Sequence, residues 1–108
     1  MATTYKVLGQ SAPSATTATA LYTVPSATSA VVSTINVCNR GSLGTFRIAV
    51  RPAGASLANQ HYLAYDLQLP ASESIAITIG VSLAATDVLE VYASSADFTF
   101  AAFGAEMS

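Results

Sequence analysis

Charged residues are scarce in this sequence. Four Lys or Arg and six Asp or Glu make up only 9% of the 108 residues, whereas a typical soluble domain carries about 25%. Ala, Ser and Thr fill 46 positions instead, and 52% of the residues are hydrophobic. A free monomer normally keeps charge spread over its surface. The deficit therefore predicts a subunit whose surface contacts other proteins, rather than a catalyst.

Other absences narrow the class of protein further. The single cysteine, Cys38, excludes an internal disulfide. A net charge of −2 leaves no basic face for nucleic acid, so no nucleic-acid partner is expected. Apolar runs of only a few residues exclude a transmembrane helix, so no membrane contact is expected. Residues 1–6 have no signal-peptide pattern, and the length predicts one domain.

Residues suited to catalysis or metal binding are not grouped. Because His61 and Cys38 are single and far apart, and the acidic residues are dispersed, we predict no catalytic residue, metal site, cofactor or enzymatic activity. His61 is interpreted as a surface or capping residue at the start of a strand, with a general base as the alternative. Cys38 is expected to be buried and inert, with a thiol activated by nearby Arg40 as the alternative.

Apolar residues recur with a period of two, which indicates β-strands. Seven or eight short strands are expected, separated by turns that contain Gly or Pro. The expected strands cover residues 5–8, 21–25, 30–39, 45–51, 61–69, 74–80, 88–93 and 98–103. Residues 83–93 could also form a short helix, but Val88, Val91 and Tyr92 favour a strand. Their number and spacing predict an all-β fold, an antiparallel β-sandwich resembling a jelly roll.

Two of these strands are expected to form a hairpin. Residues 30–39 and 45–51 are joined by a polar turn that contains two glycines, which is typical of an antiparallel pair. In the second strand, Arg47 and Arg51 alternate with apolar residues. They are therefore expected on the solvent-facing or partner-facing side.

The first twenty residues differ in composition from the rest. Residues 10–20 are almost entirely Ser, Ala, Thr and Pro, which bury too little apolar area to offset the entropy lost on ordering. We therefore divide the chain into an N-terminal arm or linker over residues 1–20, which could become ordered against a neighbouring subunit, and a single β-sandwich domain over residues 21–108.

Interface residues are expected in the arm and in the predicted hairpin. The arginines are either part of a solvated strand face or interface anchors, because Arg is enriched at protein interfaces. Tyr62 and Tyr65 are expected on opposite faces of their strand, one in the core and one against a partner or ligand. The candidate interface residues are Tyr5, Val7, Leu8, Arg40, Arg47, Arg51 and Tyr62.

Four segments resemble small β-sandwich virion proteins of tailed bacteriophages, including phages of cyanobacteria and marine bacteria. They are a Tyr-Thr-Val-Pro strand at 22–25, alternating valines leading to Asn-Arg-Gly at 39–41, Thr-Phe-Arg-Ile-Ala-Val-Arg at 45–51, and Thr-Asp-Val-Leu-Glu-Val-Tyr-Ala at 86–93. The resemblance covers about residues 20–104 and brings no catalytic or metal residue with it.

This resemblance implies a capsid decoration (cement) protein on the exterior of the virion. Its expected partners are the major capsid protein or other virion proteins, and it is expected to form a homo-oligomer, with a trimer favoured. A component of the tail, the baseplate or the fibre attachment is the alternative. A second alternative is a module that binds the host or a glycan through Tyr62 or Tyr65.

Overall fold

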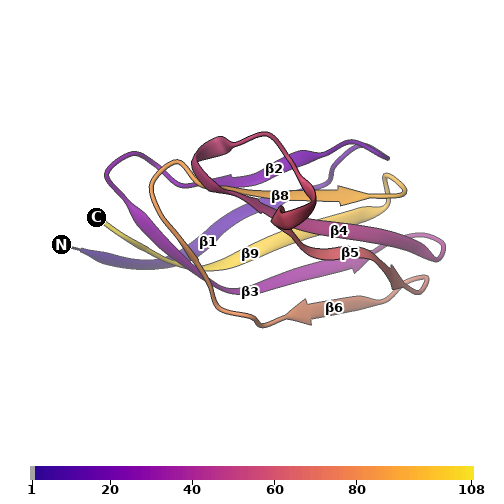
Figure 1. The fold of residues 1–108 in the computed structure, drawn as a ribbon. Helices are drawn as coiled ribbons and strands as arrows, with labels where there is room; N and C mark the ends of the chain where they lie inside the picture. Colours follow the sequence, from indigo (N-terminus) through magenta and orange to yellow (C-terminus); the bar gives the residue numbers. More distant parts are fainter. Residues whose placement is uncertain (1) are drawn as a thin grey trace.

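The computed structural model describes residues 2–108, which form nine β-strands and two short 3₁₀ turns (Figure 1). The strands are β1 (Thr3–Ser11), β2 (Thr19–Thr23), β3 (Ser29–Asn39), β4 (Gly44–Arg51), β5 (Tyr62–Leu69), β6 (Ser74–Ile77), β7 (Val81–Leu83), β8 (Val88–Ala93) and β9 (Phe98–Met107). The predicted all-β sandwich is confirmed. The alternative of a helix over residues 83–93 is wrong, because β7 and β8 occupy that segment.

The strand order is that of a jelly roll. Sheet A has the order β1-β9-β3-β6, with β7 also paired to β3, and sheet B has the order β2-β8-β4-β5. Because β6 and β7 pair with successive parts of β3, they act as one interrupted strand. The chain then forms the antiparallel pairs β1–β9, β2–β8, β3–β6/β7 and β4–β5, a long hairpin rolled into two sheets. This arrangement is a double-sheet jelly roll.

The core lies between the two sheets, and aromatic rings from both sheets meet in it. Phe46 of sheet B has its ring centroid 6.2 Å from those of Phe98 and Phe100 of sheet A. All three side chains are buried. Contacts of this kind contribute beyond the burial of their area. They hold the two sheets in a fixed relation, so each sheet presents only its outer face and its edges to solvent.

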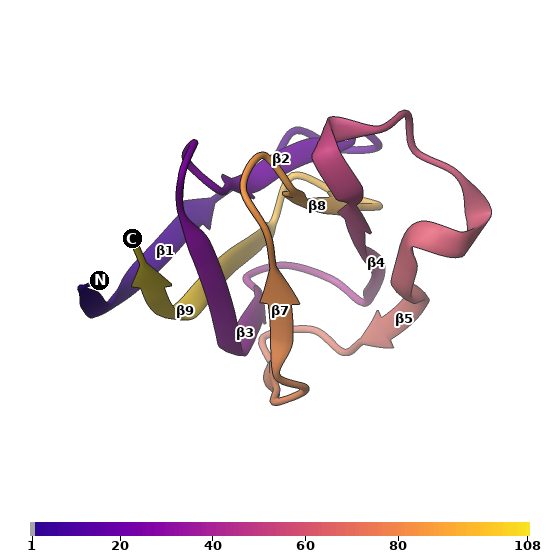
Figure 2. The same ribbon diagram turned by 60° about the vertical axis from the view of Figure 1, so that its left-hand side comes forward.

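The predicted hairpin of residues 30–39 and 45–51 is wrong. β3 lies in sheet A and β4 in sheet B, so the turn between them crosses from one layer to the other (Figure 2). The Asn39 side chain holds this corner. Its Nδ2 donates to the carbonyl oxygens of Ser42 and Leu69 at 2.8 and 3.0 Å, and its Oδ1 accepts from the Gly41 amide at 3.0 Å. A polar corner of this kind resembles a hairpin turn in sequence, because both need Asn and Gly.

The predicted division at residue 20 is also corrected. Residues 3–11 form β1, an edge strand of sheet A paired with β9, and the boundary falls inside β2. A strand was expected over residues 5–8, and β1 extends it in both directions, while most of the Ser, Ala, Thr and Pro segment forms the loop over residues 12–18 between β1 and β2. Gly9 lets β1 approach β2 closely, since a Cβ at this position would lie 2.1 Å from the Leu21 carbonyl oxygen. Met1 of the predicted arm lies outside the described residues.

Bulges break the period of two in four strands, among them β2, where the register shifts between Ala20 and Tyr22. In β3 the register shifts between Val32 and Thr34, so the buried side changes from even to odd positions. In β5 it shifts twice, and Asp66 adopts a positive φ of 51°. In β1 it shifts between Val7 and Gly9. Each extra residue changes the face on which the following side chains lie.

Candidate protein interaction surface

The outer face of sheet A carries no charged side chain in its three longest strands. The pairing places rows of neighbouring side chains across β1, β9 and β3, on the side opposite the buried phenylalanines. We call this surface the neutral face. It consists of Thr3, Tyr5, Val7 and Gln10 of β1, Val31, Ser33, Thr34, Asn36 and Cys38 of β3, and Thr99, Ala101, Phe103, Ala105 and Met107 of β9.

Phe103 forms a ridge at the centre of the neutral face. The residue is 38% exposed, and its outward neighbours along β9 are the small residues Ala101 and Ala105. Small side chains beside a large one leave a hollow on either side. The ridge therefore separates an apolar hollow towards the chain termini from a more polar hollow at the other end.

The apolar hollow has a volume of about 680 Å³. Most of its walls come from apolar side chains that remain exposed, Tyr5 at 85%, Val7 at 46% and Val31 at 37%. Isolated exposed apolar residues are ordinary, but a contiguous group of them marks an interaction site. The three residues belong to β1 and β3, on either side of β9, so three neighbouring strands build the hollow.

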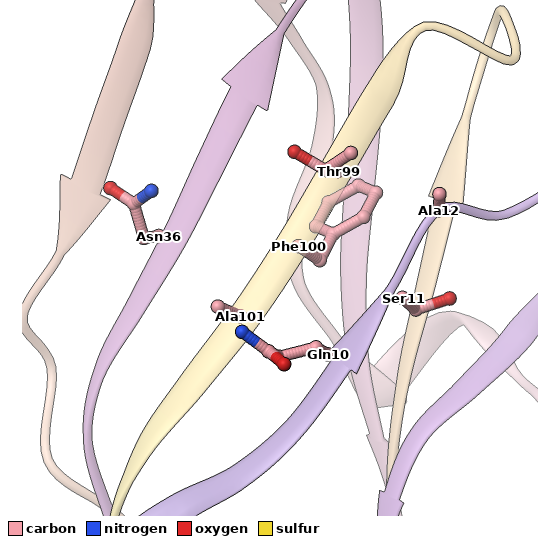
Figure 3. Close-up of a pocket in the computed structure, with 7 residues that line it drawn as sticks. All are labelled: Gln10, Ser11, Ala12, Asn36, Thr99, Phe100 and Ala101. Atoms are coloured by element: carbon pink, nitrogen blue, oxygen red, sulfur yellow. The ribbon is translucent and has the colours of Figure 1, made fainter.

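The polar hollow, of about 410 Å³, lies over Ala101 (Figure 3). Gln10 of β1 and Asn36 of β3 pair with Ala101 from opposite sides, and Thr99 lies one row further along β9. Their amides and hydroxyl can donate and accept hydrogen bonds without carrying charge. This end of the neutral face can therefore match backbone or side-chain groups of a partner and fix the orientation of contact.

The outer face of sheet B has the opposite chemistry, and we call it the ion-pair face. Two arginines of β4 dominate it, as the alternation within that strand predicted. Arg47 Nε donates to Asp66 Oδ1 at 2.7 Å, and its guanidinium lies 4.1 Å and 4.3 Å from the ring centroids of Tyr65 and Tyr92. The hydrogen bond to Asp66 raises the pKa of Arg47 above its ordinary value. Arg47 is thus held between two rings and a carboxylate.

The second arginine of this face is held as firmly as the first. Arg51 Nε donates to Glu90 Oε1 at 3.1 Å, and its Nη1 donates to the carbonyl oxygens of Gly54 and Ala55. Glu90 is only 8% exposed, so the pair lies partly under the loop that joins β4 to β5. Two of the five N–H donors of Arg47 and three of those of Arg51 bind within the chain, so both arginines are partly committed to contacts inside this face.

A third ion pair holds the end of β1 on the inner side of sheet A. Lys6 Nζ donates to Glu106 Oε1 at 3.3 Å, and Tyr22 Oη donates to Glu106 Oε2 at 2.5 Å. The bond from Tyr22, aided by Lys6, holds the pKa of Glu106 below its ordinary 4.5. Burial and the bond to Glu106 raise the pKa of Tyr22 above its ordinary 10.0. The two charges of β1 and β9 are therefore turned away from the neutral face.

The structure divides the seven candidate interface residues among different places. Tyr5 and Val7 lie on the neutral face. Arg47, Arg51 and Tyr62 belong to the ion-pair face and its margin. Arg40 lies at the corner after β3 and donates to the Ala96 carbonyl oxygen. Leu8 is in the core at 9% exposure, so its assignment to an interface is corrected: it directly follows outward-facing Val7, so its side chain lies on the opposite, inner face of the sheet.

The remaining candidates also differ in part from expectation. Tyr62 and Tyr65 are not on opposite faces, because the bulges of β5 bring their rings together edge to face, 4.8 Å apart. Cys38 is half-buried on the neutral face rather than in the core. His61 is a capping residue, as expected, and its Nδ1 accepts from the Ala58 amide at 3.0 Å.

Sequence reasoning missed Phe103, Val31 and Met107 as members of a surface. A signal existed for Phe103, because it has the opposite parity to the buried Phe98 and Phe100 of the same strand. The bulge in β3 concealed Val31, which shares its parity with buried Ile35.

Comparisons with known proteins give no further guide: no protein-family model matches the sequence, and no curated protein is similar to it. Within residues 2–108, no three His, Cys, Asp or Glu side chains are grouped to hold a metal ion. The same residues contain no helix long and apolar enough to span a membrane.

Proposed function

We propose that this chain is a structural subunit of a virus particle, a decoration protein that binds the capsid lattice of a tailed bacteriophage and stabilises it. The neutral face is the observation that carries the proposal. The buried centre of a protein interface is depleted of charged residues and enriched in aromatic ones. Covering this face would bury Phe103 and Tyr5. Lys6 is the one charged residue that lines the apolar hollow, and it is already paired with Glu106 on the inner side of the sheet, so the cost of removing water from ions stays small.

The architecture suits a component that acts by contact. Phe46, Phe98 and Phe100 pack the two sheets against each other, so we expect the neutral face to meet its partner as a preformed surface with little ordering cost. The charged side chains of the ion-pair face are already paired, so we expect this face to be the one that is turned to solvent on the particle. The resemblance to phage virion proteins supplies the class of partner. On a lattice that offers many equivalent sites, weak contacts become collectively strong.

The proposal is tested with capsids of the encoding phage prepared without this protein. Added protein should co-sediment with the capsids and raise the temperature at which they release DNA. Phe103→Lys, which places a charge on the central ridge, should lower binding at least tenfold. Leu43→Lys, at a position 62% exposed in the turn after β3, adds the same charge away from the neutral face and should bind normally.

Three results would reject the capsid assignment. The first is no binding and no gain in heat resistance. The second is equal loss of binding in the two lysine variants, because charge alone would then explain the effect. The third is binding to purified tails and not to capsids, which would favour a tail component instead.

A further inference from the structure

The sandwich has four strand edges, and three of them are protected against pairing with another strand. β2 and β5 are interrupted by register shifts, and β6 and β7 are only four and three residues long. Short or bulged edges are the usual protection against edge-to-edge contact. β1 is different. Its first five residues, Thr3–Val7, run in unbroken register along β9, and bonds between Ala2 and Ser108 extend the pairing.

The outer edge of β1 is free to pair. Within residues 2–108, no strand lies beyond β1 in sheet A, so alternate amides and carbonyls of residues 3–7 have no strand partner. All five residues are exposed. Figures 1 and 2 show this part of β1 beside the end of β9, at one extremity of the molecule, where a second molecule can approach.

We infer that β1 pairs with β1 of a second copy of the chain, antiparallel and about a two-fold axis at Tyr5. This inference concerns contact between copies and goes beyond the proposed function. An edge strand related by a two-fold axis supplies the same donors and acceptors on both sides, as an isologous interface requires. The two A sheets then become one continuous sheet, and the two neutral faces become one surface.

Charge and side-chain chemistry select the register. With the axis at Tyr5, the opposed pairs are Tyr5 with Tyr5, Lys6 with Thr4, and Val7 with Thr3 of the other copy. The rings form a cross-strand aromatic pair, which stabilises antiparallel strands, and no like charges face each other. An axis at Lys6 would instead oppose two ammonium groups, which destabilises the pair. Lys6 is meanwhile held by Glu106 on the inner side of the sheet.

The inference is tested on the full-length chain alone, without capsids, so its outcome is separate from that of the proposed function. Sedimentation across a range of concentrations should show a species of twice the 11.0 kDa chain mass. Tyr5→Lys and Tyr5→Asp should each weaken this dimer at least tenfold, because each places two like charges at the axis. Leu43→Lys is the matched control and should not change it.

Mixing the two variants provides the decisive step. An equal mixture of Tyr5→Lys and Tyr5→Asp should restore the dimer as a mixed species, since position 5 of one copy then faces the opposite charge on the other. Tyr5 is 85% exposed, so neither change disturbs folding, which circular dichroism would verify. A monomer at every concentration, a trimer, or a dimer that is indifferent to these changes would overturn the inference.

Discussion

The outer face of sheet B concentrates charge, whereas the outer face of sheet A excludes it from its three long strands. Arg47 and Arg51 each bind a carboxylate of a neighbouring strand or bulge, and two tyrosine rings enclose Arg47. On sheet A the corresponding positions hold Ala, Thr, Asn, Gln and exposed aromatic residues. A chain with so few charges places four of them in two ion pairs on this face, Arg47 with Asp66 and Arg51 with Glu90. The neutral face carries no charged side chain of its own, and this difference is the reason that we propose it as the face for contact.

The largest difference in stability is expected between two phenylalanines of one strand, because β9 carries one group of them in the core and Phe103 on the neutral face. Phe100→Ala removes a ring from the core shared by both sheets and should cost about 3–5 kcal/mol of unfolding free energy. Phe103→Ala removes a ring from the neutral face and should cost less than about 1 kcal/mol. Urea titrations followed by circular dichroism measure both. Similar costs for the two variants would mean that Phe103 is not a surface residue.

The next largest effect is expected on the ion-pair face. Arg51→Ala leaves Glu90, which is nearly buried, without its cation and should cost about 2 kcal/mol, somewhat less than a fully buried pair because Arg51 is partly solvated. Arg40→Ala is the control, since Arg40 bonds only to an exposed carbonyl oxygen, and it should cost under about 1 kcal/mol. Thermal unfolding compares the two. A loss no larger for Arg51→Ala than for Arg40→Ala would contradict a stabilising role for the ion pair of Arg51 and Glu90.

The cluster of Lys6, Tyr22 and Glu106 should make stability depend on pH. Because its folded pKa is depressed, Glu106 stabilises the fold above its unfolded pKa, and this contribution is lost as the pH falls through the folded pKa. Glu106→Gln should therefore cost about 1 kcal/mol at pH 7 and progressively less in acid. Melting temperatures of both proteins at neutral and acid pH give the comparison. A constant difference across that range would show that the carboxylate charge is not responsible.

The smallest effect is expected for the exposed ion pair. Asp66→Asn should cost no more than about 1 kcal/mol, because the carboxylate is largely solvated and the tyrosine rings still hold Arg47. The difference should shrink further in high salt. Chemical unfolding at low and high salt measures it. Capsid binding should be unchanged, and a loss of binding here would move the interface towards sheet B.

The sequence predicted the strands well, but not the way in which they assemble. Phe46 and Ile48 alternate with arginines in β4, and both buried positions and both arginine positions were predicted correctly. Strand identity depends on local alternation, which the sequence contains. The pairing of β3 with β9 joins residues about seventy positions apart, and no local pattern encodes it. The Asn-Arg-Gly corner therefore suggested a hairpin where the chain changes sheets.

The interaction surface was predictable only in part, and bulges are the physical reason. One extra residue near Thr34 or Asp66 changes the side on which the rest of a strand faces. A prediction of side-chain faces from the period of two in the sequence assumes that the strand contains no extra residue of this kind. The scarcity of charge was visible in the composition. That the charged side chains lie away from the outer face of sheet A became visible only once the strand order was known.

The most direct test of the neutral face as the contact surface is hydroxyl-radical footprinting of the protein free and bound to capsids. Each face carries oxidisable side chains, so one experiment contains its own control. We expect Phe103 and Met107 to be protected on the capsid, while Tyr65 and Tyr92 of the ion-pair face react at the same rate as in the free protein. Protection of Tyr65 and Tyr92, with Phe103 and Met107 unchanged, would contradict it.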